Sequence, residues 1–346
     1  MGERRGIIAG GNWIVDHVKV IDAWPPQDAL ANIVSETKGN GGSPYNLLKN
    51  LAKLDARIPL EGIGLVGEDA DGRHILSDCE FHGIKTAQLK STARAATGYT
   101  DVMTVRGSGR RTFFHSRGAN ALLAAEDFDF TGSQARHFHL GYALLLDALD
   151  QTDAKGIPRM GEVLARARRA GLTTSLDCVS EPSDRFRSVI TPVLPEVDVL
   201  FVNDFEAEQL TGIAVGRGRQ IARAAVEQAA RSMLALGVRQ QVVIHFPEGA
   251  YACRPDGQSA WCPSLRVPAE SMAGAAGAGD ALAAGVLLGL HEDWPMKKCL
   301  ALAVCTAAAC LTEVTCSDGV RSMAECLELG QRWGYQELSC IGVTGR

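Results

Sequence analysis

The stretch Ala273-Gly274-Ala275-Ala276-Gly277-Ala278-Gly279-Asp280-Ala281-Leu282 decides how the rest of the chain is interpreted. Glycine weakens a helix, so glycines beside an apolar helical run indicate that backbone must approach something closely. A helix beginning near Gly277 would direct its free N–H groups and positive dipole end at a phosphate or another developing anion. Asp280 in the first turn would then be placed to remove a proton from an attacking hydroxyl. The alternative is a tight packing turn in which Asp280 only stabilises the helix dipole.

Composition limits the classes of protein to be considered. The chain has 346 residues, 46% hydrophobic and 22% charged, which is enough for one large α/β domain or two smaller ones. A net charge of -5 provides no basic field for nucleic acid or an anionic membrane. With neither a transmembrane run nor a signal-peptide hydrophobic region in sight, we expect a cytoplasmic protein. None of the ten cysteines forms a Cys-x-x-Cys pair, so they are expected to be reduced core residues.

From residue 137 onward, short apolar strands alternate with helices, which indicates a parallel sheet covered on both faces. Ligands of such sheets bind outside the carboxyl ends of the strands. Asp177, Asn203 and Asp280 fall at predicted strand ends or just beyond, so they are expected to line one crevice. Asn203 also begins a helix with an acidic first turn that includes Glu206, which is ordinary capping chemistry.

A second glycine cluster, Gly39-Asn40-Gly41-Gly42-Ser43-Pro44-Tyr45-Asn46, leads into a helix with a leucine face. Glycines before a helix allow a ligand to reach backbone donors. The Asn46 amide both donates and accepts hydrogen bonds, which suits a polyol. The alternative is a helix-capping turn.

Two segments interrupt the α/β pattern. Residues 16–38 are polar and favour β structure, and residues 97–118 alternate as a β-hairpin with a glycine turn. Together they predict a small β flap carried on the main domain. Arg117 and Asn120 close the hairpin, where they would either face the ligand or serve as hinge residues.

The Gly277-Ala278-Gly279-Asp280 turn, followed by a small residue, an apolar residue and Gly285, resembles the signature of the ribokinase-like (pfkB) carbohydrate kinases. Matches extend from near residue 10 to near residue 320. The resemblance implies a three-layer α/β/α sandwich over residues 1–346, with a mostly parallel sheet and a β lid at 16–38 and 97–118. It implies an ATP-dependent kinase for a monosaccharide or sugar acid. A nucleoside kinase and a catalytically silent sugar-binding or regulatory protein on the same fold are the alternatives.

The resemblance also assigns roles to residues. Asp280 would be the base and Gly277, Ala278 and Gly279 the anion hole. The residues expected to bind the sugar are Asp16, Gly41, Gly42, Asn46, Arg117 and Asn120. Those expected to bind the nucleotide are Asn203, His245, Gly249 and Cys305, the last on a helix over Ala301–Leu311 that would cover the adenine. Glu206 would organise Mg²⁺ through water, because Mg²⁺ keeps most of its own waters. Exposed lid edges make a homodimer through the lid an expectation as well.

Three features depart from the family pattern: Gly274-Ala275, the turn from His245 to Gly249, and Leu48, which stands where a small residue is usual. Gly274 and Ala275 stand where Asp-Thr is usual, which puts activation by a monovalent cation in doubt. The turn from His245 to Gly249 is one residue short, and Pro247 lacks a backbone donor for nucleotide phosphates. Residues after about 325 are expected to be a tail whose Trp333 and Tyr335 pack on the core.

Overall fold

A mixed sheet forms the centre of the computed structural model, which describes residues 4–108, 110–217 and 220–338. Within these residues nine strands follow the order β15-β14-β13-β10-β9-β8-β1-β4-β5. Their bounds are β1 (Ile7–Gly11), β4 (Leu60–Gly67), β5 (Ile84–Thr92), β8 (His137–Ala143), β9 (Thr173–Cys178), β10 (Val199–Asn203), β13 (Gln241–Phe246), β14 (Gly249–Cys253) and β15 (Ser259–Pro263). The strands from β5 to β13 are parallel, and β14 and β15 add an antiparallel edge.

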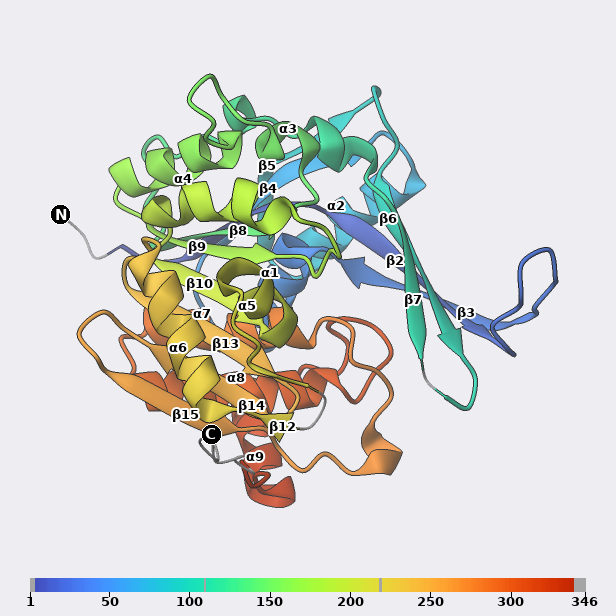
Figure 1. Cartoon of the computed structure of the whole chain (residues 1–346). Coiled ribbons are helices and arrows are strands. Elements are labelled where there is room, and N and C mark those ends of the chain that lie inside the picture. Colours follow the sequence, from blue (N-terminus) through green and yellow to red (C-terminus); the bar gives the residue numbers. More distant parts are fainter. Residues whose placement is uncertain (1–3, 109, 218–219, 339–346) are drawn as a thin grey trace.

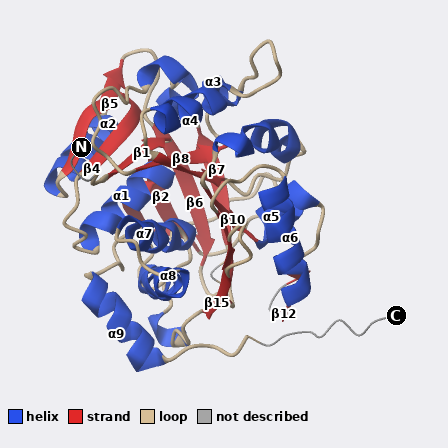
Figure 2. Ribbon diagram, turned by 90° about the vertical axis from the view of Figure 1, so that its left-hand side faces the viewer, coloured by secondary structure: helices blue, strands red, loops and turns tan. Residues whose placement is uncertain are grey.

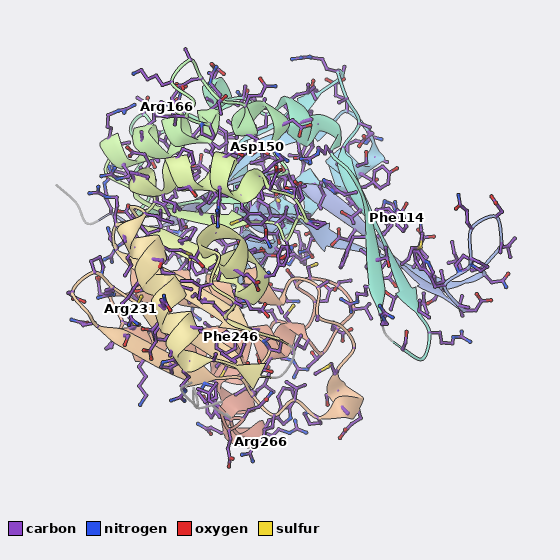
Figure 3. All side chains as sticks on the ribbon, in the orientation of Figure 1. Phe114, Asp150, Arg166, Arg231, Phe246 and Arg266 are labelled. Atoms are coloured by element: carbon purple, nitrogen blue, oxygen red, sulfur yellow. The ribbon has the colours of Figure 1, made fainter. Side chains whose placement is uncertain are left out.

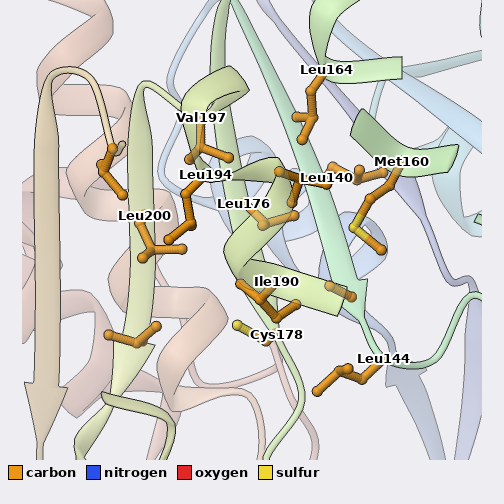
Figure 4. Packing of buried hydrophobic residues seen from close by; sticks show 14 of the residues in the cluster. Leu140, Leu144, Met160, Leu164, Leu176, Cys178, Ile190, Leu194, Val197 and Leu200 are labelled. Atoms are coloured by element: carbon orange, nitrogen blue, oxygen red, sulfur yellow. The ribbon is translucent and has the colours of Figure 1, made fainter. Parts of the chain in front are cut away.

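Helices cover both faces of this sheet, as Figure 2 shows. One face carries α1 (Ser43–Lys53), α2 (Ala70–Phe81), α7 (Ala278–His291), α8 (Met296–Cys310) and α9 (Met323–Trp333). The other carries α3 (Asp147–Asp150), α4 (Arg159–Arg169), α5 (Asp204–Thr211) and α6 (Arg223–Ala235). Each face buries its own apolar cluster, and in Figure 4 Leu140, Leu176 and Leu200 pack beneath the covering segments. The predicted three-layer α/β/α architecture is confirmed.

A second, smaller sheet projects from one side of the molecule (Figure 1). Its order is β3-β2-β6-β7, with β2 (Ile14–Ile21), β3 (Ile33–Gly41), β6 (Gly98–Val105) and β7 (Arg111–Ser116). We call this four-stranded sheet the lid. Its strands come from the two segments that interrupt the α/β pattern in the sequence. A short ribbon of β11 (Gly216–Arg217) and β12 (Gln220–Ile221) lies elsewhere.

The end of the chain differs from the expected tail, because α9 follows Ser322. The helix begins with a capping box: the Ser322 hydroxyl accepts from the Glu325 N–H, and the Glu325 carboxylate accepts from the Ser322 N–H. A Ser-x-x-Glu sequence is a recognisable helix start, so this signal was present in the sequence. In the described ranges, no helix is long and apolar enough to cross a membrane.

Candidate active site

The predicted glycine turn begins α7. Gly277 is the N-cap with φ +76°, a left-handed conformation that glycine adopts without strain. A Cβ at this position would stand 2.6 Å from Cys316 Cβ, so the close packing of this turn also requires glycine. Because the helix starts at Ala278, Asp280 lies in its first turn as predicted.

Asp280 is 2% exposed, and its two carboxylate oxygens have different surroundings. Oδ2 accepts hydrogen bonds from Asn46 Nδ2 at 2.8 Å and from the Tyr142 hydroxyl at 2.6 Å. Oδ1 has no hydrogen-bond partner in the part of the chain that the structure describes. Burial raises the pKa of Asp280 to about 6, against the opposing effect of its hydrogen bonds. The result is a base that is ionised at neutral pH and has one oxygen free.

A hydrogen bond from Asn40 fixes the orientation of the Asn46 side chain. Asn40, at the end of β3, donates through Nδ2 to Asn46 Oδ1 at 2.6 Å and to the Ser317 hydroxyl at 2.9 Å. Since Asn46 Oδ1 is occupied as an acceptor, its amide nitrogen is left to face Asp280. The start of α1 is thereby tied to the start of α7.

Asp16 reaches the same place from the lid strand β2. Its carboxylate is almost fully buried and accepts a hydrogen bond from Cys316 Sγ at 3.3 Å. Burial raises the pKa of Asp16 to about 7. Gly41 leaves room for this carboxylate, because a Cβ there would lie 2.5 Å from Asp16 Oδ1. Gly42 has φ +88° and caps α1.

Arg117 and Asn120 do not join this group. The Asn120 side chain donates to the Trp13 carbonyl at 3.0 Å and accepts from the Trp13 N–H at 2.9 Å. Arg117 donates to the Leu144 carbonyl at 2.9 Å and pairs with Asp147 at 3.0 Å. These contacts favour the hinge alternative for both residues.

Asn203 and Glu206 form the predicted cap of α5. Asn203 Oδ1 accepts from the Glu206 N–H, and Glu206 Oε2 accepts from the Asn203 N–H, both at 2.9 Å. Glu206 also accepts from the Ser180 hydroxyl at 2.7 Å. Burial raises the pKa of Glu206 to about 7, and burial with the charges of Asp280 and Glu206 raises that of Asp177.

These carboxylates agree with a magnesium ion held largely by its own waters and by phosphates. Among the described residues, no three His, Cys, Asp or Glu side chains converge tightly enough to hold a metal by themselves. Buried acids with raised pKa values are nevertheless stabilised by a nearby cation. Asn203 and Glu206 would hold such an ion indirectly.

His245 lies directly against the anion-hole turn. A Cβ on Gly279 would be 3.2 Å from His245 Cε1. Burial lowers the pKa of His245 to about 4, so the imidazole is neutral at pH 7. Gly249 begins β14, where a Cβ would meet the Cys262 carbonyl at 2.4 Å, so its glycine is needed for strand packing.

Cys305 lies apart from these residues, although the expected helix is present as α8. Its side chain is fully buried, with Sγ 3.9 Å from the Tyr335 hydroxyl and close to Gly330 of α9. The C-terminal segment that was expected to be a tail therefore covers the position predicted to face adenine.

The residues around Gly274 do not fit a monovalent-cation site of the usual kind. Gly274 and Ala275 supply no side-chain oxygen. The guanidinium of Arg111, from lid strand β7, lies where a side chain at Gly274 would project.

Three residues of this site were not singled out from the sequence as site residues: Tyr142, Asn12 and Asn40. Asn12 Oδ1 accepts from the Tyr142 N–H at 2.7 Å, and its Nδ2 has no partner in the described ranges. Asn12 directly follows β1, and Tyr142 lies one residue before the end of β8, both of them strands of the parallel sheet. Their position at the carboxyl ends of neighbouring strands was the available signal.

The structure combines a parallel α/β core, a β lid and a buried carboxylate at a helix N-terminus. Residues 11–323 match the model described as pfkB family carbohydrate kinase, and the chain belongs to this family. Its class of enzyme is that of the ATP-dependent carbohydrate kinases.

Named relatives span most of the chain. An ATP-dependent ribose-1-phosphate kinase of Halopiger xanaduensis is 28% identical over 315 residues, which cover 90% of this chain and 91% of that protein. A 5-dehydro-2-deoxygluconokinase of Geobacillus kaustophilus is 23% identical over 296 residues, or 84% of each chain. Arabidopsis thaliana ribokinase, solved with ribose and ATP, has a TM-score of 0.75 at 20% identity, covering 94% of this chain and 98% of that one. At this identity the structural likeness establishes the fold alone.

Proposed function

We propose that this enzyme transfers the γ-phosphoryl group of ATP to a hydroxyl of a monosaccharide or sugar acid, with Asp280 as the general base. The observation that carries the proposal is the free Oδ1 of a buried carboxylate in the first turn of α7. A hydroxyl bound there would meet the base and the anion-binding end of the helix at once.

Each residue of the proposed site has its own role in the transfer. Asp280 Oδ1 takes the proton of the acceptor hydroxyl, and the N–H groups at Gly277, Ala278 and Gly279 stabilise negative charge at the transferring phosphoryl group. Mg²⁺, when bound with ATP, screens the phosphate charges. Asn203 and Glu206 would hold that ion through water, and His245 and Gly249 would lie along the nucleotide phosphates. Closure of the lid would exclude water, which otherwise competes as acceptor.

A polyol suits the unpaired polar atoms around Asp280. Asn12 Nδ2 offers a donor, whereas Asn40 Oδ1 and Asp280 Oδ1 offer acceptors, and all three lack partners among the described residues. Buried polar atoms are rarely left unpaired, so these atoms indicate where ligand hydroxyls bind. Asp16 adds a further acceptor, with Gly41, Gly42 and Asn46 beside it. Neighbouring hydroxyl groups of a sugar both donate and accept, and match this set.

Turnover of Mg·ATP should be measured with pentoses, hexoses, sugar acids, sugar 1-phosphates and nucleosides. Asp280→Asn should lower kcat for the accepted compound by about 10³-fold, since a general base contributes roughly 10²–10⁴. Asp293→Asn, which removes an exposed carboxylate paired with Arg136, is the control and should keep wild-type turnover. A nucleoside as the sole acceptor would establish the nucleoside-kinase alternative. Saturable sugar binding without turnover would establish a silent binder.

We also propose that the lid mediates a homodimer. Its exposed apolar side chains include Ile33, Phe113 and Phe114, and the Trp24 and Phe114 rings stack at 6.1 Å. Figure 3 shows Phe114 on a strand of the projecting lid. Apolar side chains gathered beside open strand edges favour association with another copy of the same sheet.

A further inference from the structure

The hydroxyl of Tyr142, at the carboxyl end of β8, makes the two oxygens of Asp280 inequivalent. It donates to Oδ2 at 2.6 Å, and Asn46 Nδ2 donates to the same oxygen at 2.8 Å. Oδ1 is buried and receives no hydrogen bond from any residue that the structure describes. One oxygen is therefore held by the protein and the other is left for a ligand.

We propose that Tyr142 is a positioning residue that holds Asp280 through Oδ2, so that Oδ1 is the atom that accepts the proton of the sugar hydroxyl. This inference rests on the proposed function, because it assigns an orientation to the base of that reaction. Tyr142 stays bound to Asp280 when the acceptor arrives, and acts through the carboxylate rather than on the sugar.

The backbone around Tyr142 supports a fixed side chain. The Tyr142 N–H donates to Asn12 Oδ1 at 2.7 Å, and the Asn12 N–H donates to the Gly141 carbonyl at 3.0 Å. The rival arrangement has the phenol occupying the place of the acceptor hydroxyl and leaving when sugar binds. That arrangement gives the free Oδ1 no role, and it makes Tyr142 a competitor of the substrate.

The charges facing Asp280 make its hydrogen bonds important. Titratable groups face Asp280 from several elements: the acids Asp16 on β2, Asp177 on β9 and Glu206 on α5, and the uncharged thiols of Cys310 and Cys316. Burial favours the neutral acid, whereas the Tyr142 and Ser43 hydroxyls and the Asn46 amide favour the carboxylate. Removing the phenolic hydroxyl should therefore raise the pKa of Asp280.

The test is the pH dependence of kcat/KM for Tyr142→Phe. We expect its acidic limb to move to higher pH by about one unit, because a hydrogen bond to the ionised form is lost. Activity should fall severalfold at pH 6 and return toward wild type at pH 9, with little change in the KM for sugar. Tyr45→Phe is the matched control: it deletes another 2.6 Å tyrosine–aspartate hydrogen bond, to Asp78, outside the site. The Tyr45→Phe variant should keep the acidic limb of kcat/KM at the wild-type pH.

Two further measurements separate positioning from a general structural effect. In an Asp280→Asn background, Tyr142→Phe should cost nothing more, because its effect passes through the carboxylate. The ¹³Cγ resonance of Asp280, assigned as the one lost in Asp280→Asn, should titrate at higher pH in Tyr142→Phe. The inference is overturned if the Asp280 titration does not shift in Tyr142→Phe. It is also overturned if the acidic limb of kcat/KM stays in place while the KM for sugar falls. If the wild-type chain turns over no acceptor, the proposed function fails, and the ¹³Cγ titration still decides this inference.

Discussion

The guanidinium of Arg111 on lid strand β7 lies against Gly274 of the main domain, where a Cβ would stand 2.1 Å from Nη2. The lid register places Arg111 on the same sheet face as Asp16, because Thr104 pairs with both Arg111 and Val20. A positive charge carried by the lid therefore reaches the segment that leads into the anion hole. It lies beside a position where the family pattern has a carboxylate.

Catalysis should consequently be independent of potassium. We expect turnover in K⁺ and in tetramethylammonium buffers to agree within about twofold, since no side-chain oxygen at 274 or 275 is available to hold the ion. Arg111→Met should lower kcat about tenfold through loss of positive potential near the phosphoryl group. Arg110→Met changes a neighbouring exposed arginine and should have no effect. Strong activation of the wild type by K⁺ would contradict this account.

Asp16 should destabilise the folded state of the sugar-free protein, although it is proposed to bind the sugar. Burial raises its pKa from 3.8 to about 7, so the folded state binds its proton more tightly than the unfolded state does. Its contribution to stability is therefore present at low pH and is lost as pH rises toward 7. Asp16→Asn should stabilise the sugar-free protein at pH 8 by on the order of a few kcal/mol, and by much less near pH 4.

Urea unfolding at the two pH values checks this prediction. Asp101→Asn, which removes a lid carboxylate paired with Lys19, is the control and should give no such gain. The Asp16 variant should also lose its affinity for the sugar. Equal destabilisation at both pH values would show that Asp16 has a purely structural role.

Much of the fold and the candidate site was predictable because it lies in continuous motifs. The glycine turn before Asp280, the Asn203–Glu206 cap and the interrupted pattern of the lid each depend on neighbours in sequence. The capping box at Ser322 was equally local, and the expectation of a tail overlooked it. These features are set by backbone conformation, which short-range sequence largely determines.

The remaining features depend on which distant segments meet. Tyr142 on β8 meets Asp280 on α7 only when the helix is packed on the assembled sheet, and neither segment contains that arrangement in its own sequence. Arg111 and Gly274 meet only when the lid is placed on the main domain. Cys305 matched the family pattern locally, yet Tyr335 covers it in this chain. Such contacts follow from tertiary packing, which motif matching does not describe.

The two outer glycines of the anion hole should respond differently to alanine. Gly277→Ala combines a positive φ, costing roughly 1–2 kcal/mol, with a contact of 2.6 Å to Cys316 Cβ, so both stability and kcat should fall. Gly279→Ala meets only the His245 ring, at 3.2 Å, which can shift. It should fold nearly normally but lose phosphoryl transfer. Gly257→Ala has a positive φ in open space and isolates the backbone cost. Equal unfolding free energies for the Gly277 and Gly257 variants would contradict the packing argument.

The proposed contact through the lid predicts a dimer that substitutions on the lid disrupt. Light scattering after gel filtration should give about twice the 36.8 kDa of one chain. Replacing Ile33 and Phe113, which are 54% and 58% exposed, by serine should give a monomer, since apolar lid surface would no longer be buried between copies. Phe81→Ser removes an even more exposed aromatic side chain from α2, outside the lid, and should leave the dimer intact. A wild-type chain that stays monomeric at 100 µM, or a dimer that tolerates both lid substitutions, would place the contact elsewhere or remove it altogether.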